Sequence, residues 1–531
     1  MSKRQFRVLV TDKVSGGALG ALKDDARFEV VQVNDSKDGE FTQALATAHG
    51  LIVRSATKVK GPMMDQAPEL RVIGRAGVGV DNIDLTAATE RGIAVLNAPA
   101  GNTVSAAELT MALILAMVRR VAEAHAAMQQ GTWSKLQGAE LRGRTLGLVG
   151  AGRIGGEVAK RCRAFGMDVI AYDPYLTDER AAELQVQRAK LEDVLTKGDI
   201  ISLHVPLTDD TKNMIGKETL ARMKKGAFVV NVARGGVVDE AALAEALKSG
   251  HLAGAALDVY VNEPLEKDSP LLGAPNVLLT PHLGASTGEA QELVASEIAE
   301  AVRAALAEGD LSRALNAPAI GGEALRALAP MFELGRALGK LGCAIAPGGV
   351  QGVEVRYAGD SDEALKPLTA YVLMGLLQNV LGPDQVNFVS AGHLANQRGI
   401  RVARTQLSQD TDYTEYVEVV LQSENGEVRL AGALLGEAHP RIVRIEDYRV
   451  DIVPAGALIV LKNHDVPGVI GRVGTILGDH DINIAEYHQA RMSKGGQALA
   501  AIAVDGEVGA DVREALLELP EVSSAVVVRL S

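Results

Sequence analysis

The sequence predicts an α/β fold with two doubly wound parallel sheets, then an α+β region and a small βαββαβ unit. Short apolar runs alternate with helical patterns through residues 6–281, a rhythm that is typical of parallel sheets. A chain of 531 residues is also too long for one hydrophobic core. Its 56 glycines suit the many tight βα turns that such sheets need. We therefore expect several domains.

The first sheet is predicted from four apolar runs. They lie at residues 8–10, 50–53, 72–73 and 94–96. A helical pattern begins at Ser105, an N-cap candidate with Glu108 three residues on, and predicts a long helix to about Gln130 that crosses into the second domain. The helical segment 286–309 is expected to pack back on the first domain. The first domain is thus predicted from residues 1–100 and 286–318.

The second domain is predicted to span residues 101–285. Its strands are expected near residues 146–149, 168–172, 200–203, 227–231, 254–258 and 276–279. A proline- and glycine-bearing linker follows at 316–322. Residues 323–452 mix helical and strand patterns, which predicts an α+β intervening domain. Residues 455–531 follow the ferredoxin-like order βαββαβ.

The composition excludes several classes of protein. With 47% apolar and 23% charged residues it is ordinary globular material, and a net charge of −13 argues against a nucleic-acid surface. Cys162 and Cys343 cannot form a disulfide framework and lack zinc-site spacing, so we expect a reducing cytoplasm and no metal. The longest helical apolar run, Met111 to Val118, is too short to span a bilayer.

A glycine fingerprint follows the first predicted strand of the second domain. Gly150, Gly152 and Gly155 form G-x-G-x-x-G directly after a strand and before a helix, the pattern of Rossmann-like dinucleotide sites. The helix N-terminus would then face the pyrophosphate. Asp173 ends the next strand, where a carboxylate accepts the ribose hydroxyls and favours NAD over NADP. The alternative is that the glycines serve only packing.

Three polar residues follow strands of the same domain. Arg234, Glu263 and His282 each lie just past an apolar run, and in an open α/β sheet such positions line the ligand crevice. Glu263 could orient His282 for transfer of a substrate proton, and Arg234 could bind a carboxylate bidentately. The alternatives are a satisfied surface histidine and an arginine that pairs locally with Asp239.

Further polar groups lie at other strand ends and in the terminal unit. Arg54, Ser55 and Arg75 could bind an anion such as a phosphate, or be ordinary surface residues; Gly77 and Gly79 form a turn whose N–H groups could hold a carboxylate. Asp258 could lie near the nicotinamide carboxamide, or be a strand-end cap. In the terminal unit, Asn463, Asp465 and Asn483 could bind a small amino acid, but by spacing alone they are better explained as turn residues.

Seven stretches carry a resemblance that covers essentially the whole chain. They are GLIVRSATKV, GRAGVGVDNIDL, GNTVSAAELT, LGLVGAGRIG, NVARGG, ALDVY and PHLGAST. The chain resembles the long-form D-3-phosphoglycerate dehydrogenases within the D-2-hydroxyacid dehydrogenase family. The resemblance implies NAD-dependent oxidation of 3-phospho-D-glycerate to 3-phosphohydroxypyruvate, the first step of L-serine biosynthesis.

The resemblance also implies roles for individual residues. The catalytic set is implied to be Arg234, Glu263 and His282. The implied NAD contacts are Gly150, Gly152, Arg153, Ile154, Gly155, Asp173, Val232, Ala233, Arg234, Asp258, His282, Leu283, Gly284 and Ala285. The implied substrate contacts are Arg54, Ser55, Arg75, Gly77 and Lys135, the last lent across a dimer.

The second half of the chain is implied to be regulatory. Residues 455–531 resemble an ACT domain, which pairs edge to edge and binds serine, and Asn463, Asp465 and Asn483 align with that site. Residues 323–452 resemble the intervening domain, where His439, Arg441 and Arg444 are candidate anion ligands. A homodimer or homotetramer is implied. The alternatives are a reductase for hydroxypyruvate, glyoxylate or 2-oxoglutarate, or a non-enzymatic NAD(H)-sensing protein.

Overall fold

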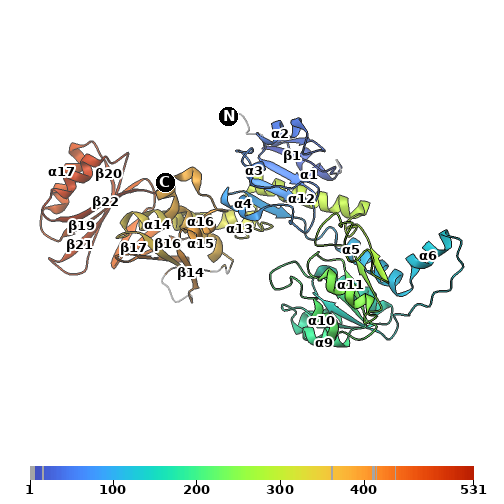
Figure 1. Ribbon diagram of the computed structural model, residues 1–531. Coiled ribbons are helices and arrows are strands. Elements are labelled where there is room, and N and C mark those ends of the chain that lie inside the picture. Colours follow the sequence, from blue (N-terminus) through green and yellow to red (C-terminus); the bar gives the residue numbers. More distant parts are fainter. Residues whose placement is uncertain are drawn as a thin grey trace.

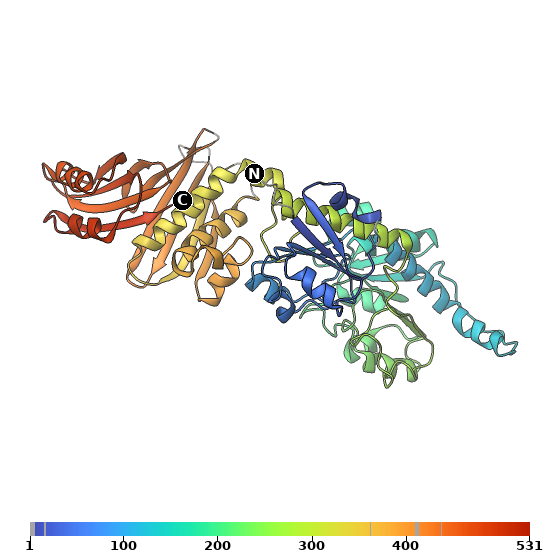
Figure 2. The same cartoon turned by 90° about the horizontal axis from the view of Figure 1, so that it is seen from above.

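The computed structural model describes residues 6–14, 17–359, 361, 363–408, 413, 415–436 and 438–530. The molecule is elongated, with two parallel-sheet domains at one end and two smaller units at the other (Figure 1). Seen from above, the terminal unit lies at one end of the molecule and helix α6 at the opposite end (Figure 2). The predicted catalytic and NAD-binding residues all belong to the two parallel-sheet domains, whereas the predicted regulatory residues belong to the two smaller units.

The first sheet has five parallel strands in the order β2-β1-β3-β4-β5. The strands are β1 (Phe6–Val10), β2 (Phe28–Gln32), β3 (Gly50–Val53), β4 (Val72–Arg75) and β5 (Ala94–Asn97). The helical segments are η1 (Gly17–Leu19), α1 (Gly20–Lys23), α2 (Gly39–Leu45), α3 (Gly61–Met64), α4 (Leu85–Glu90) and α12 (Gly288–Glu308). Helix α12 packs its apolar face on this sheet and so returns the chain to its first domain.

The second sheet has seven strands in the order β12-β11-β10-β9-β6-β7-β8. The strands are β6 (Thr145–Val149), β7 (Asp168–Tyr172), β8 (Gln187–Arg188), β9 (Ile200–Leu203), β10 (Phe228–Asn231), β11 (Gly254–Leu257) and β12 (Val277–Leu279). The helices are α5 (Thr103–Val118), α6 (Val121–Gln129), α7 (Arg153–Ala164), α8 (Asp178–Leu184), α9 (Leu191–Lys197), α10 (Lys217–Arg222) and α11 (Glu240–Lys248). The strand order reverses between β6 and β9, which is where such sheets bind ligands.

The predicted long helix from Ser105 to Gln130 is wrong in two respects. The first helix begins at Thr103 after Asn102, so Ser105 lies inside it and caps nothing. Arg120 then adopts a left-handed conformation with φ +51, which ends α5 and starts α6 in a new direction. The physical reason is burial: α5 packs in the second core, whereas α6 buries none of its residues.

The predicted linker around residue 316 is held firmly to the first domain. Asn316 accepts a hydrogen bond from the Val95 N–H at 2.8 Å and donates to the Ile93 carbonyl at 2.9 Å. Beyond it, Asn387 of the intervening domain donates to the Gly92 carbonyl at 2.8 Å. The two halves are therefore connected by specific hydrogen bonds at the start of β5.

The intervening domain has a mixed sheet in the order β14-β13-β15-β16-β17-β18. The strands are β13 (Val350–Ala358), β14 (Arg401–Gln406), β15 (Tyr416–Ser423), β16 (Gly426–Leu435), β17 (His439–Ile445) and β18 (Tyr448–Ile452). The helical segments are α13 (Gly322–Ala327), α14 (Ala329–Ile345), α15 (Leu365–Leu381), η2 (Pro383–Gln385) and α16 (Ala391–Gln397).

The terminal unit has four antiparallel strands in the order β20-β21-β19-β22. Its elements are β19 (Ala457–His464), α17 (Val469–Asp479), β20 (Ile484–Arg491), β21 (Gln497–Val504), α18 (Ala510–Leu517) and β22 (Val522–Arg529), the predicted βαββαβ order. One face of its sheet packs under α17 and α18. The other face joins the core of the intervening domain through Leu458, Val460, Leu499, Ala501 and Val528.

No helix within the described ranges is long and apolar enough to cross a bilayer.

Candidate active site

The glycine loop after β6 has the geometry of an anion site. Gly150 has φ +93, and a Cβ there would lie 2.5 Å from the His204 carbonyl oxygen, so only glycine fits. A Cβ at Gly155 would lie 2.1 Å from the Gly150 oxygen, which shows how closely helix and turn pack. Gly152 differs, because a Cβ there would meet nothing within 4 Å.

Gly152 is also the N-cap of α7, and no side chain caps that helix. The free N–H groups and the space above them fit the pyrophosphate of a dinucleotide. Asp173, just past β7, accepts hydrogen bonds from the N–H groups of Ala151 at 3.0 Å and Tyr175 at 2.9 Å. Its carboxylate is thereby fixed beside the glycine loop, as a ribose-binding acid would need to be.

Eight of the predicted cofactor residues line a single cavity of about 280 Å³ beside that loop. They are Ile154, Val232, Ala233, Arg234, Asp258, His282, Gly284 and Ala285. The structure therefore brings together residues from the ends of three strands and the first turn of α7. Arg153 is exposed next to Ile154, and Leu283 belongs to the loop that closes the cavity.

Asp258 lines the cofactor cavity and is also hydrogen-bonded within the chain, as a strand-end cap would be. It is fully buried, and its two carboxylate oxygens accept hydrogen bonds from Leu283 N at 2.8 Å, Gly284 N at 2.9 Å and Thr280 Oγ1 at 2.6 Å. The carboxylate thus ties the loop that carries His282 to the end of β11.

His282 and Glu263 form a hydrogen-bonded pair. His282 Nδ1 lies 2.7 Å from Glu263 Oε2, and Glu263 Oε1 accepts a hydrogen bond from Tyr260 N at 3.1 Å. Burial would by itself raise the pKa of Glu263, but the hydrogen bond with His282 and the backbone N–H of Tyr260 outweigh it, so the pKa is lowered. An ionised Glu263 fixes the ring and leaves Nε2 for a substrate.

Four of the five predicted substrate residues line a second cavity of about 440 Å³ that also contains His282 and Glu263. Arg54, Ser55, Arg75 and Gly77 come to it from the first domain. Burial, together with the charge of Arg234, lowers the pKa of Arg75 to about 10, so its guanidinium is still cationic at neutral pH. The cavity therefore combines a proton-transfer pair with two arginines at the opposite wall.

Two lysines and one acid at this site escaped sequence reasoning. Lys13 and Lys58 line the same cavity and add to its positive charge. Asp81 lies across from Arg234, with Oδ2 3.2 Å from Arg234 Nε, whereas Asp239 caps α11. The local alternative for Arg234 is thus wrong, because its acidic partner comes from the other domain.

Lys135 and the regulatory candidates lie away from this site. Lys135 is exposed on the segment after α6, which projects from the second domain (Figure 1). Asn463 is fully buried and donates to the His464 carbonyl at 2.8 Å, Asp465 pairs with Arg491 at 2.7 Å, and Asn483 donates to Asp505 at 2.7 Å.

The candidate anion ligands of the intervening domain do not form a free basic cluster. Arg441 binds Asp451 at 2.8 Å and Glu486 at 3.1 Å, and Arg444 pairs with the nearly buried Glu418. His439 is exposed at the start of β17. The charges of Arg441 and Arg444 are therefore matched by carboxylates, and Arg441 links this domain to the terminal unit.

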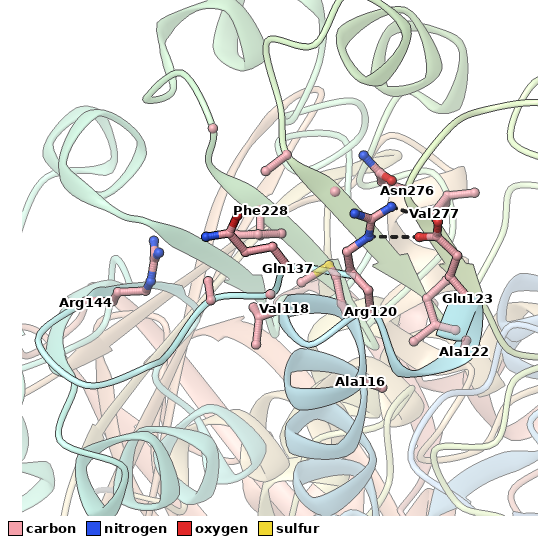
Figure 3. A pocket seen from close by; sticks show the side chains of 17 residues that line it. Ala116, Val118, Arg120, Ala122, Glu123, Gln137, Arg144, Phe228, Asn276 and Val277 are labelled. Carbon is pink, nitrogen blue, oxygen red and sulfur yellow. Dashed lines mark hydrogen bonds and ion pairs between the residues drawn. The ribbon is translucent and has the colours of Figure 1, made fainter. Parts of the chain in front are cut away.

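A further cavity, of about 640 Å³, contains none of the predicted site residues. It lies at the amino ends of β10 to β12, between Phe228, Val277 and the junction of α5 and α6 (Figure 3). An ion pair between Arg120 and Glu123, 2.7 Å, lies at its edge. Within the described ranges, no group of three or more His, Cys, Asp or Glu side chains could hold a metal ion.

Comparison with known proteins identifies three family regions. Residues 111–284 match the D-isomer specific 2-hydroxyacid dehydrogenase NAD-binding domain, residues 327–446 the D-3-phosphoglycerate dehydrogenase intervening domain, and residues 457–521 the ACT domain. The chain is 40% identical to the D-3-phosphoglycerate dehydrogenases of Bacillus subtilis and Methanocaldococcus jannaschii, over 99% of this chain and 100% of theirs.

Solved structures match the catalytic half. A D-lactate dehydrogenase from Aquifex aeolicus, complexed with NAD and lactic acid, is 32% identical with a TM-score of 0.50, and covers 58% of this chain and 97% of that one. A glyoxylate reductase from Paecilomyes thermophila is 29% identical with a TM-score of 0.53, over 59% and 98%. The predicted α/β fold and the NAD cofactor are thereby confirmed.

Proposed function

The chain belongs to the D-3-phosphoglycerate dehydrogenase family, and from that premise we propose that it oxidises 3-phospho-D-glycerate to 3-phosphohydroxypyruvate. This is the step that leads toward L-serine. The observation that carries the proposal is the 440 Å³ cavity, which combines the His282–Glu263 pair with Arg54 and Arg75. A substrate with a carboxylate at one end and a phosphate at the other needs cations on both sides of a proton acceptor.

The residues divide the chemistry as follows. His282 accepts the C2 hydroxyl proton at Nε2 while Glu263 holds the ring at Nδ1 and stabilises the imidazolium. Arg234 binds the C1 carboxylate and polarises the C2 oxygen. NAD supplies the acceptor for the C2 hydride. Arg54 and Arg75 bind the phosphate, which sets the distance of C2 from His282.

Cofactor choice is assigned to Asp173. Its carboxylate is held beside the glycine loop by two N–H groups, where it would accept the ribose hydroxyls and repel a 2′-phosphate. We also propose a cytoplasmic location, supported by the free thiols of Cys162 and Cys343.

A direct assay separates this function from its alternatives. NADH formation is measured with 3-phospho-D-glycerate and NAD⁺, and NADH consumption with glyoxylate, hydroxypyruvate and 2-oxoglutarate. Turnover of the phosphorylated substrate with the highest kcat/KM supports the proposal. Turnover of glyoxylate alone would identify a general 2-oxoacid reductase, and NADH binding without any turnover would identify a sensor.

We further propose a homodimer in which a second copy covers the 640 Å³ cavity and receives Lys135. The support is the projecting segment itself: Val121, Met128 and Trp133 are 53%, 52% and 79% exposed, and α6 buries none of its residues. Light scattering of the wild-type protein and of Trp133→Ala tests this. A wild-type monomer would refute it.

Serine is the proposed effector of the ACT domain. Asn463, Asp465 and Asn483 are its candidate ligands, although each has an internal partner in the single chain. The same NADH assay with and without serine tests the idea, with Asp465→Ala expected to abolish any inhibition while retaining basal turnover.

A further inference from the structure

Asp81 is an acid in the cleft that neither binds the substrate nor transfers its proton in the proposed reaction. Asp81 follows the glycine turn after β4, in the first domain. It lines both the 440 Å³ cavity that contains His282 and the 280 Å³ cavity that contains Asp258. Asp81 therefore lies at the wall between the substrate and cofactor cavities.

Asp81 contacts Arg234 from across the cleft. Its Oδ2 lies 3.2 Å from Arg234 Nε, while Arg234 Nη1 donates to the Ala233 carbonyl at 2.7 Å. These two contacts engage Nε and Nη1 of the planar guanidinium, and Nη2 takes part in neither. Since Arg234 follows β10 of the second domain, this ion pair joins the two domains at the reacting centre.

A glycine in the same turn is shaped to receive the arginine. A Cβ at Gly79 would lie 2.0 Å from Arg234 Nη2 and 2.9 Å from Asp81 Oδ2. The guanidinium thus rests on the Gly79 backbone, in space that any other side chain would fill. The turn and the acid form one receptor for Arg234.

Charge explains why an acid is needed there. Arg75 and Arg234 are close enough that the positive charge of Arg234 lowers the pKa of Arg75, whereas Asp81 raises it. Without Asp81, two guanidinium groups would repel each other across the cleft. The carboxylate of Asp81 offsets part of that repulsion.

We propose that Asp81 is a positioning residue that holds the Arg234 guanidinium against Gly79, in the orientation in which the guanidinium binds the C1 carboxylate. This inference rests on the proposed function. Asp81 touches neither reacting atom, and it acts through Arg234. An ion pair in which one partner is 73% exposed contributes little to folding, so its loss changes turnover without unfolding the protein.

The test is Asp81→Asn in the full-length enzyme, with Asp24→Asn as the control. Asp24 is an exposed acid of the same domain that lines neither cavity, so the control makes the same charge change. We expect kcat/KM for 3-phospho-D-glycerate to fall at least about tenfold, mostly in kcat, because a displaced guanidinium no longer stabilises the transition state. The Kd of NADH and the Tm are expected to stay at wild-type values in both variants.

A double-mutant cycle with Arg234→Lys decides whether Asp81 acts through Arg234. In the Arg234→Lys background, Asp81→Asn should cause no further loss of kcat/KM, because lysine has no Nε for Asp81 to contact. Gly79→Ala should reproduce the loss of Asp81→Asn and should also be without effect beside Arg234→Lys. Equal losses in both backgrounds, or wild-type kcat and KM for Asp81→Asn, would overturn the inference.

The fate of the proposed function is read separately from the wild-type enzyme. If wild type turns over glyoxylate but not 3-phospho-D-glycerate, the substrate assignment fails. The same cycle is then measured with glyoxylate, whose carboxylate makes the same demand on Arg234.

Discussion

The two parallel-sheet domains share a fold class but present anion-binding groups in opposite ways. In the second domain the turn after β6 offers bare N–H groups, with glycines at 150, 152 and 155 and no capping side chain on α7. In the first domain the carboxyl ends of β3 and β4 offer side chains, Arg54 and Arg75. Backbone groups suit a pyrophosphate that every NAD molecule carries, whereas long side chains suit a substrate that must be selected.

Because of this difference, the two anion sites should be lost through different kinds of substitution. The backbone site depends on local conformation, so it fails when a side chain is added. The side-chain site depends on charge, so it fails when a side chain is removed. Four experiments test that contrast.

His282→Ala should lower kcat by about 10²–10⁴-fold, because the C2 hydroxyl loses its proton acceptor. Since the ring lies at the rim of the cofactor cavity and its loop is held by Asp258, the Kd of NADH should change little. Stopped-flow and NADH fluorescence titration measure the two quantities. Full retention of kcat would refute the role of His282.

Arg75→Ala should lower kcat/KM for 3-phospho-D-glycerate by about 10- to 100-fold, the cost of one charged hydrogen bond. The loss should be far smaller for glyoxylate, which has no phosphate. Arg71→Ala, an exposed arginine just before β4, is the matched control. An equal loss with both substrates would mean that Arg75 serves the fold or the cleft as a whole and does not select a phosphate.

Gly152→Ala and Gly150→Ala should have opposite signatures. A Cβ at Gly152 meets no atom within 4 Å, so the free energy of unfolding should be unchanged while the Kd of NADH rises about tenfold as the pyrophosphate space fills. A Cβ at Gly150 meets the His204 carbonyl at φ +93, so unfolding should cost about 1–3 kcal/mol less. Urea denaturation and NADH titration compare them. Equal destabilisation would contradict the open space at Gly152.

Glu263→Gln should flatten part of the acid dependence of stability. The folded state lowers the pKa of Glu263, so its carboxylate contributes stability above the unfolded value of 4.5 that is lost as pH falls through the lower folded value. Wild type should therefore lose more unfolding free energy than Glu263→Gln across that window. The effect should be small, because the side chain is 37% exposed. Denaturant melts on both sides of the window would show parallel losses if the pair adds nothing.

Sequence reasoning located the strands of the catalytic half well, because buried parallel strands read as continuous apolar runs. It missed β2, whose FEVVQ sequence is mostly half-buried, and it missed the break at Arg120, which depends on where tertiary burial of α5 ends. The cleft was found by motifs at strand ends. The Asp81–Arg234 pair was visible only as an acid in GVGVDN, because its meaning needs the second domain in place.

In the intervening and ACT domains, the sequence predicted the order of the elements but not the pairing of charged side chains. The order βαββαβ was predictable from turns and periodicity, but the pairing of Arg444 with Glu418 was not, because those residues lie on different strands of a mixed sheet. Arginines that lie close together in the sequence, such as Arg441 and Arg444, can each be neutralised by carboxylates in the folded protein. Charge alone therefore located no ligand site in the intervening domain.

The two-faced sheet of the ACT domain has a mechanical consequence. Its second face completes the core of the intervening domain, and Lys340 donates a hydrogen bond to the Leu530 carbonyl at 3.1 Å. Removing the residues after 455 would therefore expose the core of the intervening domain to solvent and destabilise that domain as well.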